Sequence, residues 1–207
     1  MGVLAFGIQF FIGIRHFNEK FGQLCILESI FALSGVFLLD LIHGKSIYPK
    51  MFKKIHGNLL FRTIIIFIVI ALIQFIFQVV PLTVRDVETA LAIVFCGVSE
   101  ELFFRGIIME PFFLMGKHDT QKFKIGFPFG KPKEISFYEI FGIFLTSALF
   151  TIFHVNYYGN PSLILMVGFG GLWLVFAYWF WKDITACILA HFLLNIIFVA
   201  QFYRVWF

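Results

Sequence analysis

Three groups of ionisable and amide side chains lie inside strongly apolar stretches of this 207-residue sequence. They are Glu100 and Glu101 with Arg105, then His154, then His191 with Asn195. On a helix that turns about 100° per residue, Glu101 and Arg105 share one face and can form an ion pair. Glu100 is rotated away from that face and needs another partner. An acid, imidazoles and an amide that converge at one place could activate a water molecule, with the carboxylate as general base.

Charged side chains at the centre of a membrane span are unfavourable by about 2.5–3.5 kcal/mol each, so such residues need a reason to remain there. A single His or Asn in a membrane helix more often bonds a neighbouring helix than takes part in chemistry. Here Glu, His and a His/Asn pair stand on three separate segments. This combination favours a catalytic site over isolated packing contacts.

The composition places these groups in lipid rather than in a water-soluble core. Hydrophobic residues make up 60% of the chain and charged residues 14%, with a mean hydropathy of +0.93 and 32 Phe. Soluble domains carry about 25% charged residues, so a soluble fold is excluded. The net charge of +4 comes from basic residues between the apolar segments, which indicates contact with lipid headgroups and no nucleic-acid partner. Cys25, Cys96 and Cys187 lack any paired spacing and are interpreted as small core residues.

The apolar segments predict an all-α, polytopic membrane helix bundle of about seven, between six and eight, transmembrane helices. The segments are 1–14, 21–42, 63–82, 89–115, 137–155, 161–181 and 184–203. The first is shorter than a normal span. We expect residues 1–88 to supply accessory helices and residues 89–207 to form the catalytic core.

The basic residues divide unevenly if these spans alternate across the membrane. Eleven Lys and Arg fall in or beside the connections 43–62, 116–136 and 182–183, against four on the other side. The positive-inside rule therefore predicts that the Lys-rich loops 43–62 and 116–136 are cytoplasmic, in a multi-pass protein of a prokaryotic plasma membrane. The segment 116–136 is expected to be a solvated polar loop.

The polar groups form three motifs in the order known from one family. They are Glu-Glu-x-x-x-Arg at 100–105, Phe-x-x-x-His at 150–154 and His-x-x-x-Asn at 191–195. In this order the sequence resembles the CPBP intramembrane proteases, which include the CAAX prenyl endopeptidases and bacteriocin-processing or immunity proteins. The resemblance implies a glutamic-type intramembrane endopeptidase that acts on a membrane-embedded or lipidated peptide.

The resemblance also implies a role for each of the two glutamates, for His154 and for Arg105. Glu100 would act as the general base on a water molecule, and His154 would hold and polarise that water. Glu101 would assist or orient the base, and Arg105 would hold the two carboxylates.

His191 and Asn195 would donate hydrogen bonds to the oxyanion of the tetrahedral intermediate, which is a role that suits an amide better than zinc ligation does. No cofactor is expected. A zinc-dependent intramembrane metalloprotease stays open as an alternative, because two His and a Glu could also ligate zinc.

A non-catalytic bacteriocin-immunity protein or a proton-coupled transporter is the alternative from another class. Glu110, ten residues after Glu100, is not expected to face the site.

Overall fold

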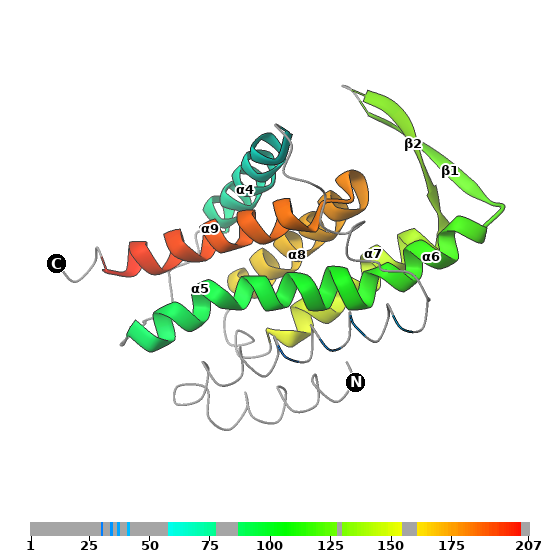
Figure 1. The fold of residues 1–207 in the computed structure, drawn as a ribbon. Coiled ribbons are helices and arrows are strands. Elements are labelled where there is room, and N and C mark those ends of the chain that lie inside the picture. The colour runs from blue at the N-terminus through cyan, green and yellow to red at the C-terminus, as the bar shows by residue number, and fades with distance from the viewer. Residues whose placement is uncertain are drawn as a thin grey trace.

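A computed structural model describes residues 58–77, 87–127, 130–154 and 161–203, together with single helical positions at 30, 34, 37 and 41. The other residues of the expected spans 1–14 and 21–42 lie outside this part of the chain, so the seven-helix count stays a prediction. The elements, shown in Figure 1, are α4 (Asn58–Ile76), α5 (Val87–Glu101), the π-helix η1 (Leu102–Met109), α6 (Glu110–His118), β1 (Lys122–Phe127), β2 (Gly130–Ser136), α7 (Phe137–Phe153), α8 (Pro161–Trp181) and α9 (Ile184–Tyr203).

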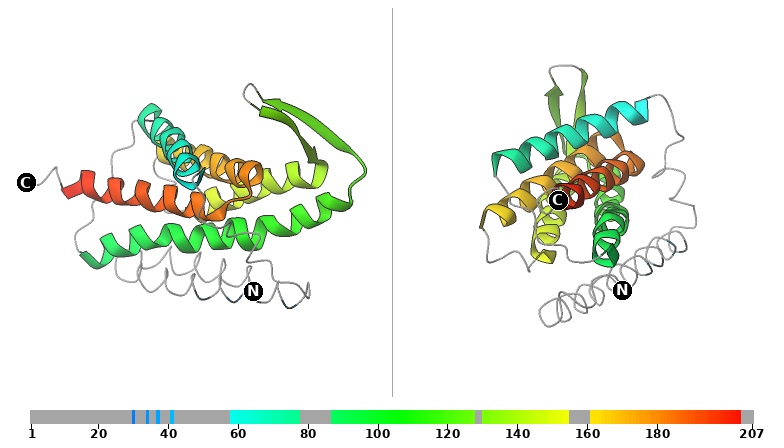
Figure 2. Two further views of the ribbon diagram at one scale, coloured as in Figure 1. Left: turned by 45° about the horizontal axis from the view of Figure 1, so that its top comes forward. Right: turned by 90° about the vertical axis from the view of Figure 1, so that its left-hand side faces the viewer.

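The described chain is a helix bundle with one hairpin at its end. Helices α5, η1 and α6 follow one another as a single long rod that runs beside α9 (Figure 1). In the end-on view of Figure 2, α8 and α9 form the middle layer, with α4 on one side and α7 and the rod on the other. This layering brings α5, α7 and α9, which carry the three motifs, around a common interior.

Local sequence explains where several helices begin. The side chain of Ser136 accepts a hydrogen bond from the Glu139 backbone N–H at 3.1 Å, and the Glu139 carboxylate accepts one from the Ser136 N–H at 2.9 Å. This capping box starts α7 at Phe137. Asp183 accepts a hydrogen bond from the backbone N–H of Ala186 at 3.3 Å and so caps α9. The expected ranges 161–181 and 184–203 coincide with α8 and α9, whereas α4 begins at Asn58 rather than at residue 63.

The segment 116–136 corrects the expectation of an all-α chain with a polar loop at this position. Strands β1 and β2 pair antiparallel there, with Phe123 opposite Ile135 and Lys124 opposite Glu134. Alternation along each strand puts Phe123 and Ile135 on one face of the hairpin. Ile135 is buried against the bundle, while Lys124 is exposed. The many Lys residues suggested a solvated loop, but the segment pairs as a hairpin in which the bundle covers Ile135 while Phe123 stays 55% exposed.

The hairpin, the start of α4 and the turn between α8 and α9 meet at one end of the bundle, which we call the hairpin end. Arg62 near the start of α4 forms an ion pair with Asp183 at 2.7 Å. The ammonium group of Lys133 donates to the carbonyl oxygen of Phe180 near the end of α8. The opposite end, formed by the start of α5, the end of α7, the start of α8 and the end of α9, is called the distal end (Figure 1).

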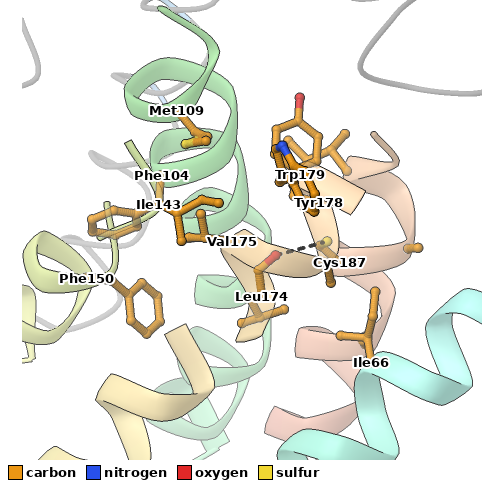
Figure 3. Packing of buried hydrophobic residues seen from close by; sticks show 14 of the residues in the cluster. Ile66, Phe104, Met109, Ile143, Phe150, Leu174, Val175, Tyr178, Trp179 and Cys187 are labelled. Carbon is orange, nitrogen blue, oxygen red and sulfur yellow. Dashed lines mark hydrogen bonds between the residues drawn. The ribbon is translucent and has the colours of Figure 1, made fainter. Parts of the chain in front are cut away.

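The middle of the bundle is densely packed with apolar side chains (Figure 3). Phe104, Phe150 and Val175 are 4% exposed or less. A Cβ atom on Gly171 would lie 2.6 Å from the ring of Phe150, so glycine is what allows α7 and α8 to approach at this level. Among the described helices, α4 and α8 are long and apolar enough to cross a membrane, and α7 and the stretch Ile184–Ile197 are shorter apolar helices.

Lys182, in the two-residue turn between α8 and α9, carries a pH-dependent prediction. Its backbone is left-handed, with φ 51°, and its buried ammonium group lies 3.9 Å from Glu139 Oε1, with no hydrogen-bond partner among the described residues. Burial lowers the pKa of Lys182 from 10.5 to about 7, against the opposing attraction of Glu110 and Glu139. Between pH 7 and 10.5, Lys182 therefore keeps its proton in the unfolded chain and loses it in the folded chain. The free energy of unfolding thus rises with pH from about 7 towards 10.5.

Lys182→Gly removes this group and accepts the positive φ without strain. The Lys182 side chain is 39% exposed, so solvent screens much of the burial effect and about 1 kcal/mol of it remains. We therefore expect the melting temperature at pH 7 to rise by roughly 2–4 °C in a chain of this size, and its increase between pH 7 and 9 to disappear. Thermal unfolding in detergent across this pH range measures both effects. Lys124→Gly is the exposed control, and equal pH slopes in wild type and Lys182→Gly would contradict the interpretation.

Candidate active site

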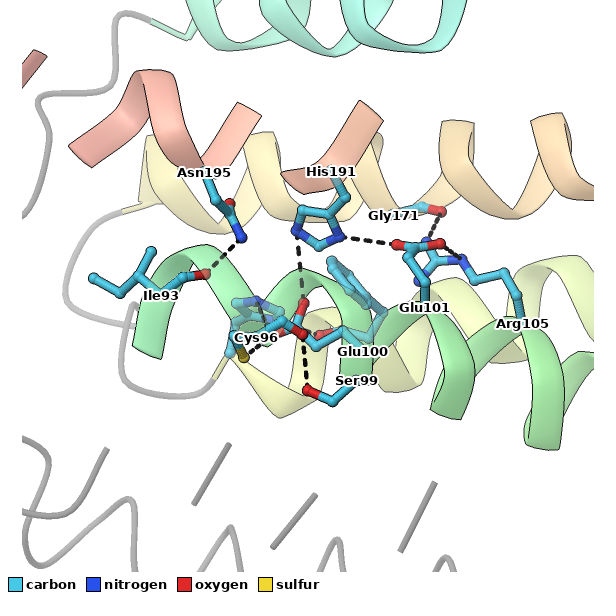
Figure 4. A network of polar contacts seen from close by, with 11 residues as sticks. Ile93, Cys96, Ser99, Glu100, Glu101, Arg105, Gly171, His191 and Asn195 are labelled. Carbon is cyan, nitrogen blue, oxygen red and sulfur yellow. Dashed lines mark hydrogen bonds and ion pairs between the residues drawn. The ribbon is translucent and has the colours of Figure 1, made fainter. Parts of the chain in front are cut away.

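Glu100, His154 and His191 come together in the interior of the bundle from three helices. Glu100 lies near the end of α5, His154 directly follows α7 and His191 lies in α9 (Figure 4 labels Glu100 and His191). Glu100 Oε1 is 3.8 Å from His154 Nε2, and Glu100 Oε2 is 3.7 Å from His191 Nε2. Glu100 is 6% exposed and His191 is 7% exposed. The carboxylate is therefore flanked by two imidazoles in a nearly closed site.

These distances are too long for direct hydrogen bonds and suit a single bridging water molecule. Oε2 of Glu100 has no direct hydrogen-bond partner among the residues that the structure describes. Both imidazoles present Nε2 to the carboxylate. The arrangement can hold a water molecule between an acceptor that takes its proton and a second group that fixes its orientation.

His154 is oriented by its own helix. Its Nδ1 lies 2.7 Å from the carbonyl oxygen of Phe150, one turn earlier in α7. A carbonyl oxygen only accepts hydrogen bonds, so Nδ1 carries a proton and donates it to this bond. In the neutral ring the lone pair is then on Nε2, on the side of Glu100, where it can accept a hydrogen bond from water.

His191 is held by the second glutamate and its arginine. His191 Nδ1 lies 2.9 Å from Glu101 Oε1, and Glu101 Oε2 lies 3.2 Å from Arg105 Nε. Arg105 also donates to the carbonyl oxygen of Gly171 at 3.2 Å, and its guanidinium lies over the ring of Phe150 at 4.9 Å. Glu101 and Arg105 are fully buried. This buried pair fixes the orientation of the His191 ring and keeps Nε2 turned towards Glu100.

Asn195 completes the polar network one helical turn after His191. Its Nδ2 donates to the carbonyl oxygen of Ile93 in α5 at 2.8 Å (Figure 4). This bond selects the orientation in which the NH₂ group, not the amide oxygen, points to α5. The amide keeps a second N–H that can donate to a developing oxyanion.

One contact of Glu100 was not expected from the sequence. The thiol of Cys96 donates to Glu100 Oε1 at 3.0 Å. Its apolar surroundings in the sequence predict a core residue, and Cys96 is indeed buried. The signal that could have found it is its position four residues before Glu100, which puts both side chains on one face of α5.

Gly97 lets α5 and α9 approach at the site. A Cβ atom there would lie 3.1 Å from both Asn195 Nδ2 and His191 Cγ, so these two groups would have to move by a few tenths of an ångström. A misplacement of about 1 Å can lower a rate about 100-fold. We expect Gly97→Ala to lower kcat up to about ten-fold and Gly97→Val about 100-fold. The change in the free energy of unfolding of each variant should be smaller than the change in its activation free energy.

The measurement is peptide cleavage by the purified variants, compared with their melting temperatures. Gly126→Ala is the matched control, because a Cβ atom at Gly126 in β1 meets nothing within 4 Å. Full activity in Gly97→Val would show that the positions of His191 and Asn195 do not limit the reaction.

A small cavity of about 100 Å³ adjoins the site. Its lining includes His154, His191 and Asn195 from the motifs and Leu163 and Met166 from α8. Glu110 lies outside it, as expected, and accepts a hydrogen bond from the Tyr178 hydroxyl at 2.5 Å instead. A peptide bond placed in this cavity would have the carboxylate, the imidazoles and the amide on its walls or next to them.

The His and Glu side chains of the site are also possible ligands of a metal ion. In ranges 58–77, 87–127, 130–154 and 161–203, no three His, Cys, Asp or Glu side chains are grouped as a metal site requires. One nitrogen of each imidazole bonds an oxygen, that of Phe150 or that of Glu101, as is also usual for a zinc-ligating His. These bonds leave both Nε2 atoms facing Glu100, so the choice between a bridging water and zinc stays a matter for experiment.

Comparison with known families agrees with the motifs. The profile described as "Type II CAAX prenyl endopeptidase Rce1-like" matches residues 87–197, more than half of the chain and all of the network just described. No curated protein and no solved structure matches the chain. The resemblance stated from the three motifs is confirmed, and the chain belongs to the Rce1-like family of type II CAAX prenyl endopeptidases.

Proposed function

We propose that this protein is an intramembrane endopeptidase that hydrolyses a peptide bond with a water molecule activated by Glu100. Its family is one of integral membrane proteases, which supports peptide hydrolysis as the reaction class. The observation that carries the assignment to Glu100 is the position of its carboxylate between two imidazole Nε2 atoms, at 3.8 and 3.7 Å.

In the proposed reaction Glu100 takes a proton from the water, and the hydroxide attacks the carbonyl carbon of the peptide bond. The C–N bond of the tetrahedral intermediate then breaks, and the proton held by Glu100 passes to the leaving amine. His154 orients the water through Nε2. Asn195 donates an N–H to the oxyanion, and His191 donates from Nε2 when its ring is an imidazolium, with Glu101 as its counter-ion while Glu100 holds the proton.

The substrate class follows from the family and from the depth of the site. CAAX proteases act on prenylated or membrane-embedded peptides, and we extend this class to the present chain as a membrane-embedded or lipidated peptide or protein. The apolar surroundings of the motifs favour a substrate that is already in the membrane.

Mass spectrometry of membrane peptides tests this proposal. Membranes from cells with the wild-type chain should contain cleavage products that are missing with Glu100→Gln, a change that keeps the size of the side chain and removes the base. Glu110→Gln is the matched control, since Glu110 bonds Tyr178 and not the site. Identical peptide sets from wild type and Glu100→Gln would argue for a binding role.

Treatment of half of the wild-type membranes with a chelator distinguishes the glutamic mechanism from a zinc-dependent one. We expect the same products with and without chelator, because the proposed water is held by side chains alone. Loss of the products on chelation, with recovery on addition of zinc only, would replace the glutamic mechanism by a zinc-dependent one.

A further inference from the structure

Cys96 is in direct contact with the proposed base. Its thiol donates to Glu100 Oε1 at 3.0 Å (Figure 4), and Cys96 is 5% exposed. The two residues are one helical turn apart, so the α5 backbone itself holds them on one face. The hydroxyl of Ser99, next to Glu100 in the chain, donates instead to the carbonyl oxygen of Cys96 at 2.9 Å. The thiol is therefore the group through which this turn of α5 contacts the base.

The Glu100 carboxylate needs such a contact to keep one orientation. The terminal torsion of a Glu side chain is broad and roughly two-fold, so covalent geometry does not fix the plane of the carboxylate. The flanking imidazoles lie 3.8 Å from Oε1 and 3.7 Å from Oε2, too far for a direct hydrogen bond. Oε2 has no direct partner among the described residues. The bond at Oε1 is thus what opposes rotation of the carboxylate.

Cys187, the other cysteine in the part of the chain that the structure describes, has different surroundings. It is fully buried in α9, and its Sγ lies 3.8 Å from the carbonyl oxygen of Leu174 (Figure 3). Hydrogen bonds to an ionised acceptor are shorter and stronger than those between neutral groups. The short contact of Cys96 fits a bond to a carboxylate, and the long contact of Cys187 fits a thiol that only fills space in the core.

We propose that Cys96 is a positioning residue of the proposed reaction, whose thiol fixes the rotation of the Glu100 carboxylate so that each oxygen stays directed to one of the two imidazoles. The role in cleavage rests on the proposed function, whereas the bond between thiol and carboxylate can be tested without a substrate. Cys96 lies outside the lining of the cavity beside the site, so its effect should appear in kcat rather than in KM.

Infrared spectroscopy of the S–H stretch in the purified full chain tests the bond. The band that disappears in Cys96→Ala belongs to Cys96, and the band that disappears in Cys187→Ala belongs to Cys187. A stronger hydrogen bond lowers the S–H stretching frequency, so we expect the Cys96 band at a lower frequency than the Cys187 band. Glu100→Gln, which makes the acceptor neutral, should raise the frequency of the Cys96 band alone. Equal frequencies of the two thiols, or a Cys96 band that Glu100→Gln does not move, would overturn the contact.

Peptide cleavage by the same variants tests the positioning, with a membrane peptide that the wild type cleaves and Glu100→Gln does not. We expect Cys96→Ala to lower kcat about ten-fold with little change in KM, because the released carboxylate is no longer held in the reacting geometry. Cys96→Ser keeps a donor at the same place and should recover most of this loss. Cys187→Ala is the matched control and should keep the kcat of the wild type, even where it lowers the melting temperature as much as Cys96→Ala does.

Two results would overturn the positioning role. One is a wild-type kcat in Cys96→Ala, and the other is a Cys96→Ser variant that is no faster than Cys96→Ala. A wild type that cleaves no peptide would instead overturn the proposed function. In that case the S–H band decides by itself whether Cys96 holds Glu100.

Discussion

Glu100→Gln should lower kcat for peptide cleavage by about 10²–10⁴-fold, the contribution of a positioned general base. Its free energy of unfolding should change by no more than about 1 kcal/mol, because the amide oxygen can still accept the hydrogen bond from Cys96 at 3.0 Å. Activity of the purified protein on a peptide identified in its membranes, together with chemical unfolding in detergent, measures both quantities.

Glu101→Gln is the informative comparison, since it changes the neighbouring residue in the same way. Glu101 is fully buried between Arg105 and His191, so the loss of its charge leaves the arginine unpaired. We expect a loss of stability of about 3 kcal/mol or more, with the activity of the folded fraction reduced less than in Glu100→Gln. The opposite ranking of the two variants in activity would move the base from Glu100 to Glu101.

Arg105→Met should destabilise the folded protein by about 3–5 kcal/mol, the usual effect of leaving a buried charge without its partner. The guanidinium is fully buried, lies 3.2 Å from Glu101 and donates to Gly171. Met has a similar length but no charge. The loss of stability therefore comes from the Glu101 carboxylate and the Gly171 carbonyl oxygen, which are left without their partner. Urea unfolding in detergent measures it.

The double variant Glu101→Gln with Arg105→Met separates the charge from the packing. Because it removes both charges, it should be more stable than the sum of the two single changes predicts. Lys124→Met on the exposed face of the hairpin is the control and should stay within about 0.5 kcal/mol of wild type. Strict additivity of the two site changes would show that the ion pair contributes no coupling.

Much of the helical framework could be predicted, because apolar runs end where polar punctuation begins. The expected starts at 137, 161 and 184 coincide with α7, α8 and α9, where Ser136, Pro161 and Asp183 act as local signals. The separation of Glu100 from the Glu101–Arg105 face also followed from helical spacing alone. These features depend on neighbours a few residues apart, which is what a single sequence records.

Contacts between segments far apart in the sequence could not be predicted in the same way. Nothing local shows that the Ile93 carbonyl orients Asn195, or that Gly97 is the point where α9 approaches α5. The hairpin was missed because its inner residue Ile135 is recognisable only once the bundle that covers it is known. The roles of the motif residues came from the family resemblance, and they remain proposals that the variants above test.

The π-helix η1 keeps two polar contacts in phase along one partner helix. Arg105 bonds Gly171 of α8, and Glu110, five residues later, bonds Tyr178 of the same helix. In an α-helix five residues rotate by about 500°, which would turn Glu110 roughly 140° away from Arg105. The wider turn of a π-helix, whose hydrogen bonds run from i to i+5, brings Glu110 back towards the flank of Arg105. A one-residue deletion between Arg105 and Glu110 that restored α-helical winding would leave these two side chains four residues apart and still on one face, so both halves of the rod would stay in contact with α8.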